Sequence, residues 1–315
     1  MTFFVVVFGL FVVSTISELI LKVHEASDKL IKDSNNAISM TAGCAVFLQV
    51  LNRLSQVDIM VPFFLSFFLS FLSFFLFFLL STPFFFFFGK DLDKCRRLLI
   101  ESGEGLVQKA SQCREIISNL SSSFIRDNMV ILVHSHSRVV MGALHLAAKQ
   151  NVRFSVYITE SRPDCSGLKT AQELQELGIP CKVILDASIG YIMEKVDLVL
   201  VGAEGVVENG GLINKIGSYQ LALIAKAAGK PLYALAESYK FVRFYPLNQY
   251  DFSSSFQRFT DFESTSSDID WPQYLEKNSP SVDYTPPEYI NFLFTDLGIF
   301  TPAAVSDELI KFYLD

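Results

Sequence analysis

The chain has 315 residues, half of them hydrophobic, which is enough to build the core of one large domain or two smaller ones. Its formal net charge of -7 argues against a protein that binds nucleic acid directly, because such proteins usually carry a basic patch. A protein partner or a small ligand is favoured instead. The five cysteines have neither CxxC spacing nor the density of a secreted disulfide scaffold, so we expect reduced thiols in the cytosol.

The chain starts with an apolar stretch, Phe3 to Val13. It is hydrophobic enough for the core of a signal peptide, but no Lys or Arg precedes it and the residues after it make a poor cleavage site. We therefore favour an incorrectly defined start or an ordinary buried segment. From Ile16 to Ile31 apolar residues recur at helical spacing among charged ones, which predicts an amphipathic helix. We expect a helical N-terminal domain over residues 14–126.

An apolar insert interrupts this domain at residues 62–88. Every residue from Pro62 to Phe88 except Thr82 is Pro, Phe, Leu or Ser. By length and hydropathy the insert is a candidate transmembrane helix. The same four residue types are those that all-pyrimidine codons encode, so a translated intron tract gives the same pattern. No excess of Lys or Arg flanks the insert before Lys90, which favours the intron over the span, and both explanations stay open.

Charged helical patterns return from Asp91 to Asp127, with a break predicted around residues 101–103. Short apolar runs then alternate with segments of helical period, which predicts an α/β domain with a Rossmann-like parallel sheet over residues 127–315. The predicted strands are Met129–Val133, Phe154–Ile158, Val183–Leu185, Leu198–Val201, Leu232–Leu235 and a last one at Ile290–Phe294, and helices are predicted at Arg138–Gln150, at Leu168–Leu177 and from Thr301 on. Residues 251–276, rich in Ser, Asp and Phe, are predicted to form a mobile acidic surface loop.

Acidic residues lie one to three positions after the ends of three predicted strands: Asp186, Glu204 and Glu237. Because the carboxyl ends of parallel strands share one edge of a sheet, we expect these carboxylates on one rim. The middle strand leads into a glycine-rich stretch, Gly202 to Gly217, that includes Lys215. Glycines allow backbone amides to approach an anion and a lysine can neutralise it, so this stretch is a candidate anion site.

Two stretches resemble a known family. The first is GYIMEKVDLVLVGAEGVVENGGLINKIGSYQLA at residues 190–222, and the second is TDLGIFTPAAVSDELIKFY at residues 295–313. Both are similar to the alpha-type branch of the initiation factor 2B family, which has methylthioribose-1-phosphate isomerases as distant relatives. The resemblance implies a non-catalytic regulatory subunit of the guanine nucleotide exchange factor for translation initiation factor 2.

The same resemblance implies a set of partners. These are a second copy of the chain, the beta and delta subunits of the exchange factor and, through them, its gamma and epsilon subunits. A further implied partner is initiation factor 2 itself, especially when its alpha subunit is phosphorylated. The alternative is an enzyme, a cytosolic isomerase of a phosphorylated ribose of the methylthioribose-1-phosphate type.

The resemblance also bears on catalysis. Ser135 stands where the isomerases carry a catalytic cysteine, and Glu204 where they carry an aspartate that acts as acid or base. A serine supplies no thiolate, and the longer glutamate displaces its carboxylate, so we predict that the catalytic pair is lost. His134 and His136 are two apart on an extended segment and should point to opposite sides, which does not make a metal pair. We expect neither a metal nor a cofactor.

An anion site is expected at the strand-to-helix junctions, where helix N-termini and free amides favour phosphate. Asn214 and Lys215 match an Asn-Lys pair that binds phosphate in the isomerases, whereas Ser166 replaces a glutamine of their pocket. The ligand implied by the resemblance is a sugar phosphate. The expected binding residues are Ser135, Arg138, Arg162, Glu204, Asn214 and Lys215.

Overall fold

The computed structural model describes residues 16–33, 41, 44, 48, 88–251, 259–261 and 278–314. By proximity of Cα atoms the chain forms two compact units, one of residues 1–35 and 43–110 and one of residues 36–42 and 111–315. The domain boundary expected after residue 126 stays a prediction. The apolar start, and the insert up to residue 87, lie outside the described residues.

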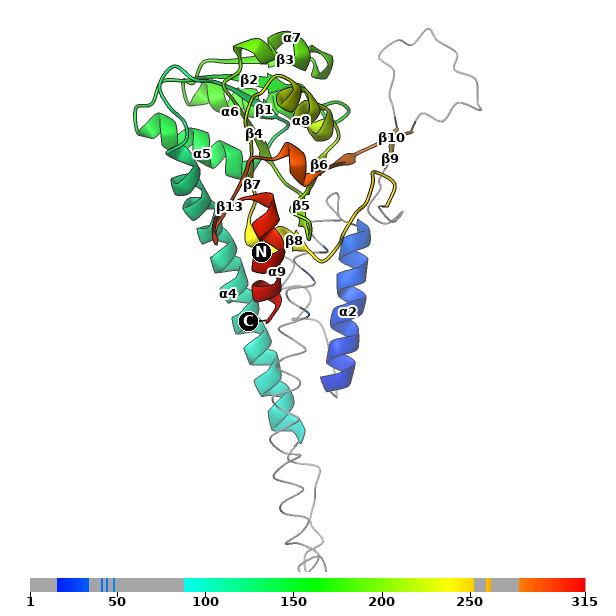
Figure 1. Cartoon of the computed structure of the whole chain (residues 1–315). Helices are drawn as coiled ribbons and strands as arrows, with labels where there is room; N and C mark the ends of the chain where they lie inside the picture. Colours follow the sequence, from blue (N-terminus) through cyan, green and yellow to red (C-terminus); the bar gives the residue numbers. More distant parts are fainter. Residues whose placement is uncertain are drawn as a thin grey trace, which may run out of the picture. The chain divides into compact units, whose positions relative to one another are not determined.

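The first unit contains helix α2 (Ile16–Asp33) and the beginning of helix α4 (Phe88–Ser122), which ends in the second unit. Helix α2 is amphipathic as predicted: Val23 is buried, while Glu18 and Lys22 form an ion pair of 3.3 Å one turn apart. The break predicted around residues 101–103 is wrong, because α4 is continuous (Figure 1). Gly103 and Gly105 each cost only about 1 kcal/mol relative to alanine in a helix interior, which good helix formers around them offset.

The described helices include none that combines the length and the apolarity needed to cross a membrane.

A seven-stranded sheet forms the centre of the second unit (Figure 1). Its strands lie in the order β13-β12-β7-β4-β1-β2-β3, and all neighbours are parallel except β12 and β13. This confirms the α/β class with a parallel sheet. The strands are β1 (Val130–His134), β2 (Ser155–Thr159), β3 (Cys181–Ile184), β4 (Leu198–Gly202), β7 (Leu232–Leu235), β12 (Phe292–Thr295) and β13 (Gly298–Phe300).

Helices cover both faces of this sheet, and successive strand residues point to opposite faces. Leu132 of β1 packs with residues of α7, α8 and α9, whereas its neighbours Ile131 and Val133 pack with α5, α6 and the end of α4. The helices are α5 (Arg138–Lys149), α6 (Gly167–Glu176), α7 (Ile189–Ile192), α8 (Ser218–Ala227) and α9 (Val305–Leu314).

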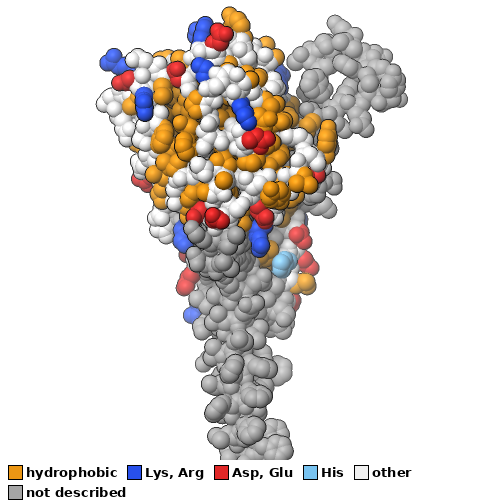
Figure 2. Space-filling view, in the orientation of Figure 1, with side chains coloured by type: hydrophobic (Ala, Val, Ile, Leu, Met, Phe, Trp, Pro, Cys, Tyr) orange, Lys and Arg blue, Asp and Glu red, His pale blue; other side chains and the backbone are white. Residues whose placement is uncertain are grey.

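The two edges of the sheet differ from the sequence-based expectation. Strand β3 is not a buried apolar run: Val183 and the following Leu185 are exposed, because no further strand lies beside β3 in the described residues. Strand β12 is not the last one, since Gly298, with a φ of 143°, begins the short antiparallel strand β13. Hydrophobic side chains also reach the surface of this unit among charged ones (Figure 2).

A second sheet of four strands follows β4 in the chain, with strand order β11-β6-β5-β8. The glycine-rich stretch therefore forms a hairpin and not only a loop. Gly210, with a φ of 81°, lies in its turn, where a side chain would collide with the carbonyl of Pro302. The four strands are β5 (Gly205–Val207), β6 (Leu212–Lys215), β8 (Phe241–Val242) and β11 (Val282–Thr285).

The stretch predicted as a mobile acidic loop is only partly described. Strand β9 (Phe259–Asp261) lies within it and pairs with β10 (Asn278–Pro280) in an antiparallel ribbon. Residues 252–258 and 262–277 lie outside the described residues, so the loop otherwise stays a prediction.

Candidate functional site

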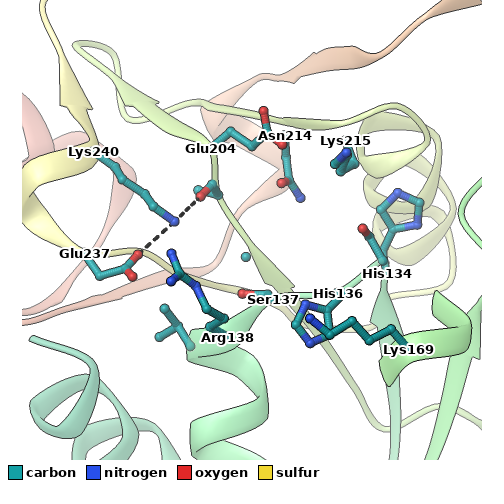
Figure 3. A pocket seen from close by; sticks show the side chains of 14 residues that line it. His134, His136, Ser137, Arg138, Lys169, Glu204, Asn214, Lys215, Glu237 and Lys240 are labelled. Atoms are coloured by element: carbon teal, nitrogen blue, oxygen red, sulfur yellow. Dashed lines mark hydrogen bonds and ion pairs between the residues drawn. The ribbon is translucent and has the colours of Figure 1, made fainter. Parts of the chain in front are cut away.

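A cavity of about 280 Å³ opens at the carboxyl ends of β1 and β4. The sheet order reverses between these two strands, since the chain proceeds from β1 to β2 and β3 on one side and to β4 and β7 on the other. Such a switch point is where open α/β sheets bind ligands. The cavity is lined by His134, Ser135, His136, Ser137, Arg138, Val139, Lys169, Gly202, Ala203, Glu204, Asn214, Lys215, Glu237 and Lys240 (Figure 3).

The turn from β1 to α5 supplies one wall. Ser135 has a φ of 65°, a left-handed conformation that is uncommon for a residue other than glycine. Two hydrogen bonds hold it there: the Ser135 hydroxyl to Ser166 Oγ at 2.7 Å, and Thr170 Oγ1 to the Ser135 carbonyl at 2.8 Å. Ser137 then caps α5. The turn is therefore fixed by neighbouring residues, and the Ser135 hydroxyl is engaged by another hydroxyl rather than by a base.

The two histidines were expected to point to opposite sides of an extended segment, but both line the cavity, where they contact different partners. His134 is buried, with Nδ1 2.7 Å from Thr159 Oγ1 and Nε2 2.9 Å from the carbonyl of Ile216. Because a carbonyl only accepts, Nε2 donates and Nδ1 accepts from the threonine. Burial lowers the pKa of His134, so the ring is neutral. His136 Nε2 lies 3.1 Å from Glu173. Within the described residues no group of His, Cys, Asp and Glu could hold a metal ion.

Two basic side chains of the cavity belong to the starts of helices. Arg138 is the first residue of α5, and its guanidinium makes no hydrogen bond or ion pair with the described residues. Lys169, near the start of α6, is well exposed and lies 3.9 Å from Glu173. Both cations are available to an anion at a position where the helix dipole also favours negative charge.

A third cation, Lys240, is paired inside the cavity wall (Figure 3). Its Nζ lies 2.8 Å from Glu237 Oε2 and donates to the carbonyl of Ala203, also at 2.8 Å. Glu237 is completely buried and accepts a further hydrogen bond from Tyr239 at 3.0 Å. Burial alone raises the pKa of Glu237, but the Lys240 charge and these hydrogen bonds outweigh it and hold the pKa below its ordinary value. The pair is therefore ionised.

Glu204 follows β4 and faces the same space. Its pKa is raised by burial, an effect that the nearby charges of Lys215 and Lys240 reduce but do not cancel. Its backbone N–H donates to the carbonyl of Ile213 at 2.9 Å, which joins the end of β4 to β6. A carboxyl group in this position can accept or donate a hydrogen bond to a hydroxyl-rich ligand.

Strand β6 of the smaller sheet supplies the opposite wall. Asn214 donates to Ser218 Oγ at 2.9 Å, and that hydroxyl donates to the carbonyl of Lys215 at 2.7 Å. The Lys215 Nζ forms an ion pair of 2.7 Å with Asp164. Gly217, with a φ of 99°, caps the start of α8, and a side chain there would press against the His134 ring. Both predicted members of the Asn-Lys pair thus line the cavity.

Five of the six predicted binding residues line this one cavity, and the exception is Arg162. The Arg162 guanidinium is 2.9 Å from Glu160 Oε1 and is more than half exposed. The predicted rim is formed by Glu204 and Glu237, whereas Asp186 accepts from the backbone N–H groups of Ser161 and Arg162 and does not line the cavity.

Sequence reasoning missed two cations of the cavity, Lys169 and Lys240. Lys169 had a usable signal, because it lies near the start of a predicted helix that follows a parallel strand. Lys240 had a weaker one, its spacing of three residues from the rim carboxylate Glu237. Neither signal shows that the side chain turns toward the cavity.

The fold and the site together define a class of protein: an α/β protein with a polar, cation-rich ligand cavity at the switch point of a parallel sheet. The chain belongs to the initiation factor 2 subunit family, whose model matches residues 11–302. This confirms the resemblance found in the two quoted stretches of sequence.

Several curated relatives support this assignment. The chain is 54% identical over 228 residues to translation initiation factor eIF2B subunit alpha of Dictyostelium discoideum, covering 71% of each chain. It is 39% identical to the protein of the same name in Caenorhabditis elegans, over 71% of this chain and 72% of that one. It is 32% identical to ribose 1,5-bisphosphate isomerase of Thermococcus kodakarensis, over 70% and 68%.

Solved structures agree with the fold. A chain of the tetrameric eIF2B-beta2-delta2 complex from Chaetomium thermophilum superposes with a TM-score of 0.68 at 17% identity, covering 98% of this chain and 86% of that one. The translation initiation factor eIF-2B of Pyrococcus horikoshii gives 0.58 at 23% identity, covering 95% and 96%. At these identities the likeness concerns the fold alone.

Proposed function

We propose that this chain is a non-catalytic regulatory subunit, of the alpha type, of the exchange factor eIF2B, which recharges translation initiation factor 2 with GTP in the cytosol. The observation that carries the proposal is the 54% identity to an eIF2B subunit alpha over 228 residues. The chemistry of the cavity agrees with a role without catalysis. The Ser135 hydroxyl is hydrogen-bonded to the Ser166 hydroxyl, and the ring nitrogens of His134 and His136 that form hydrogen bonds do so with other partners.

Its role is to promote assembly of the complex and to help it detect initiation factor 2 whose alpha subunit is phosphorylated. The partners are a second copy of the chain, the beta and delta subunits and, through them, gamma and epsilon. Identity to the eIF2B alpha subunits of two organisms supports partnership within this assembly. The homodimer and the contact with initiation factor 2 are proposed from family membership.

The cavity is proposed to bind a sugar phosphate. Arg138, Lys169 and Lys215 supply positive charge, and Asn214 and Glu204 supply polar groups for hydroxyls. The volume of about 280 Å³ suits a small ligand of this kind. The strand order around the switch point supports describing this part of the chain as Rossmann-like.

Native mass spectrometry of the endogenous protein tests the regulatory role. Complexes purified on this chain should contain the other eIF2B subunits at two copies each. The peptide map of the same sample tests whether residues 62–88 are translated. A free homodimer with only a phosphorylated ligand would contradict the regulatory role.

The second candidate is a sugar-phosphate isomerase, which the 32% identity to a ribose 1,5-bisphosphate isomerase favours. In that case Glu204 would act as the acid or base beside the Ser135 turn. Incubation of the purified chain with methylthioribose-1-phosphate and with ribose 1,5-bisphosphate, followed by NMR, distinguishes the two. We expect no conversion, and turnover abolished by Glu204→Gln would establish the enzyme instead.

A further inference from the structure

Glu204 lies in the cavity beside two lysines that form ion pairs with other carboxylates (Figure 3). Lys215 Nζ is 2.7 Å from Asp164 Oδ2, and Lys240 Nζ is 2.8 Å from Glu237 Oε2. The charges of these two lysines lower the pKa of Glu204, but burial has the larger effect and the pKa stays raised. The surroundings of Glu204 therefore favour its neutral form more than water does.

The two carboxylates that pair with these lysines behave differently. Glu237 accepts a further hydrogen bond from Tyr239, and Asp164 accepts one from the Ser166 hydroxyl. These bonds and the lysine charges hold the pKa of both carboxyl groups below its ordinary value, against the effect of burial. Both stay ionised when the pH changes around neutrality. Of the three carboxyl groups, Glu204 is the one suited to gain a proton.

The other charged or titratable groups of the cavity wall come from the turn after β1 and from the starts of α5 and α6. Arg138 and Lys169 bring positive charge to the space that Glu204 faces. His134 is neutral, because burial lowers its pKa. His136 bonds to Glu173, and a histidine can also take up a proton near neutral pH. An effect of pH on ligand binding must therefore be assigned to Glu204 by substitution.

Any anion bound in this cavity comes close to the Glu204 carboxyl group. A cavity of about 280 Å³ is about 8 Å across if it is round. At an effective dielectric constant of about 20, two negative charges about 8 Å apart repel each other enough to change an affinity about tenfold or more. An ionised Glu204 therefore weakens the binding of an anion. By reciprocity, a bound anion strengthens the binding of a proton to Glu204 by the same factor.

We propose that binding of an anionic ligand in this cavity is coupled to the uptake of one proton by the Glu204 carboxylate. The proton comes from the solvent and forms the O–H bond of the neutral acid, which can then donate a hydrogen bond to an oxygen of the ligand. Because the complex holds this proton more tightly than the empty cavity does, the affinity for the ligand rises as pH falls. This inference rests on the proposed function of the cavity as a sugar-phosphate site.

The test is calorimetric titration of the full chain and of Glu204→Gln with ribose 5-phosphate between about pH 8.5 and pH 5.5. At the upper end the variant should bind about tenfold more tightly than the wild type, because it lacks the repelling charge. This advantage should shrink as pH falls and the wild-type carboxylate gains its proton. The second ionisation of the ligand, near pH 6, affects both proteins alike and cancels in the ratio of their affinities.

Two further variants serve as controls. Glu204→Asp keeps a carboxyl group, so its affinity relative to Glu204→Gln should again rise as pH falls. Glu176→Gln makes the same chemical change at an exposed residue of α6 outside the cavity lining, and it should match the wild type at every pH. Glu204→Ala takes the place of Glu204→Gln if that variant does not fold.

The possible failures are distinguishable. A ratio of affinities between Glu204→Gln and the wild type that stays constant with pH overturns the proton coupling and leaves the sugar-phosphate site standing. Weaker binding by Glu204→Gln at the upper end of the pH range also overturns it, because Glu204 would then hold the ligand as a carboxylate. Absence of binding in the wild type and in all variants at every pH overturns both the coupling and the site.

Discussion

Two lysines that line the same cavity form ion pairs of nearly the same length, but the two pairs differ in burial. Lys240 and Glu237 are 2.8 Å apart with side chains 15% and 1% exposed, whereas Lys215 and Asp164 are 2.7 Å apart and more than a third exposed. A buried charge depends on its partner, because water cannot replace it. An exposed pair is weak and can exchange partners. The first pair is therefore structural, and the second is suited to ligand exchange.

The largest effect is expected from Lys240→Ala. It leaves the Glu237 carboxylate buried without its counter-charge, and such losses cost about 3–5 kcal/mol of unfolding free energy. Chemical denaturation measures the change. Glu237→Gln added to Lys240→Ala should recover much of the loss, and a double variant as unstable as the single one would contradict a structural pair.

A smaller loss is expected from Gly202→Ala, at a position that lines the same cavity. An added methyl group would collide with Ser137 Oγ, the cap of α5, and overpacking of this kind costs about 1–3 kcal/mol. Thermal denaturation should show the loss. Gly190→Ala is the control, since a Cβ there meets no atom within 4 Å, and an equal loss in this control would exclude the collision as the cause.

Acid should affect the two pairs unequally. The pKa values of Glu237 and Asp164 are both held below their ordinary range, so each contributes stability that is present above the unfolded pKa of about 4 and is lost as pH falls through the folded pKa. Denaturation measured between about pH 6 and pH 3 should give a flatter pH dependence for Glu237→Gln than for Asp164→Asn. An equal pH dependence of stability in the two variants would mean that the difference in burial does not change how the two ion pairs respond to acid.

The smallest effect on stability is expected from Lys215→Ala. A partly exposed ion pair contributes no more than about 1 kcal/mol, so this variant should unfold nearly as the wild type does. Calorimetry with ribose 5-phosphate should nevertheless show loss of binding. A large loss of stability instead would make Lys215 a structural residue like Lys240.

The fold could be predicted because apolar runs of strand length alternate with helical patterns in the second half of the chain. Burial on both faces gives β4 an uninterrupted run, Leu198–Val201, that sequence alone can detect. The hairpin of β5 and β6 was harder to predict, because its glycines and polar residues match a loop equally well. Its pairing with β11, which lies about 70 residues later in the chain, is a long-range contact that no local pattern specifies.

Site residues could be predicted where a basic side chain stands at a position in the chain that is typical of anion binding. Arg138 stands at a strand-to-helix junction, and Lys215 belongs to a pair that resembles a phosphate-binding motif. Arg162 shares those features, yet its guanidinium turns to Glu160, two residues away. Lys240 is brought to the cavity by a short turn after β7. Which partner a long side chain contacts depends on the packing around it. The spacing of residues in the sequence carries no information about that packing.

The cavity has walls from two sheets that share no strand pairing in the described part of the chain. Arg138 and Glu237 follow strands of the large sheet, whereas Asn214 and Lys215 belong to the small one. Two strands of the small sheet, β5 and β6, lie between β4 and α8 in the chain, and the other two, β8 and β11, follow β7. Mutations in the small sheet can therefore change one wall of the cavity while the strand register of the large sheet stays the same. In a family with this fold, ligand specificity can thus change without a change in the main sheet.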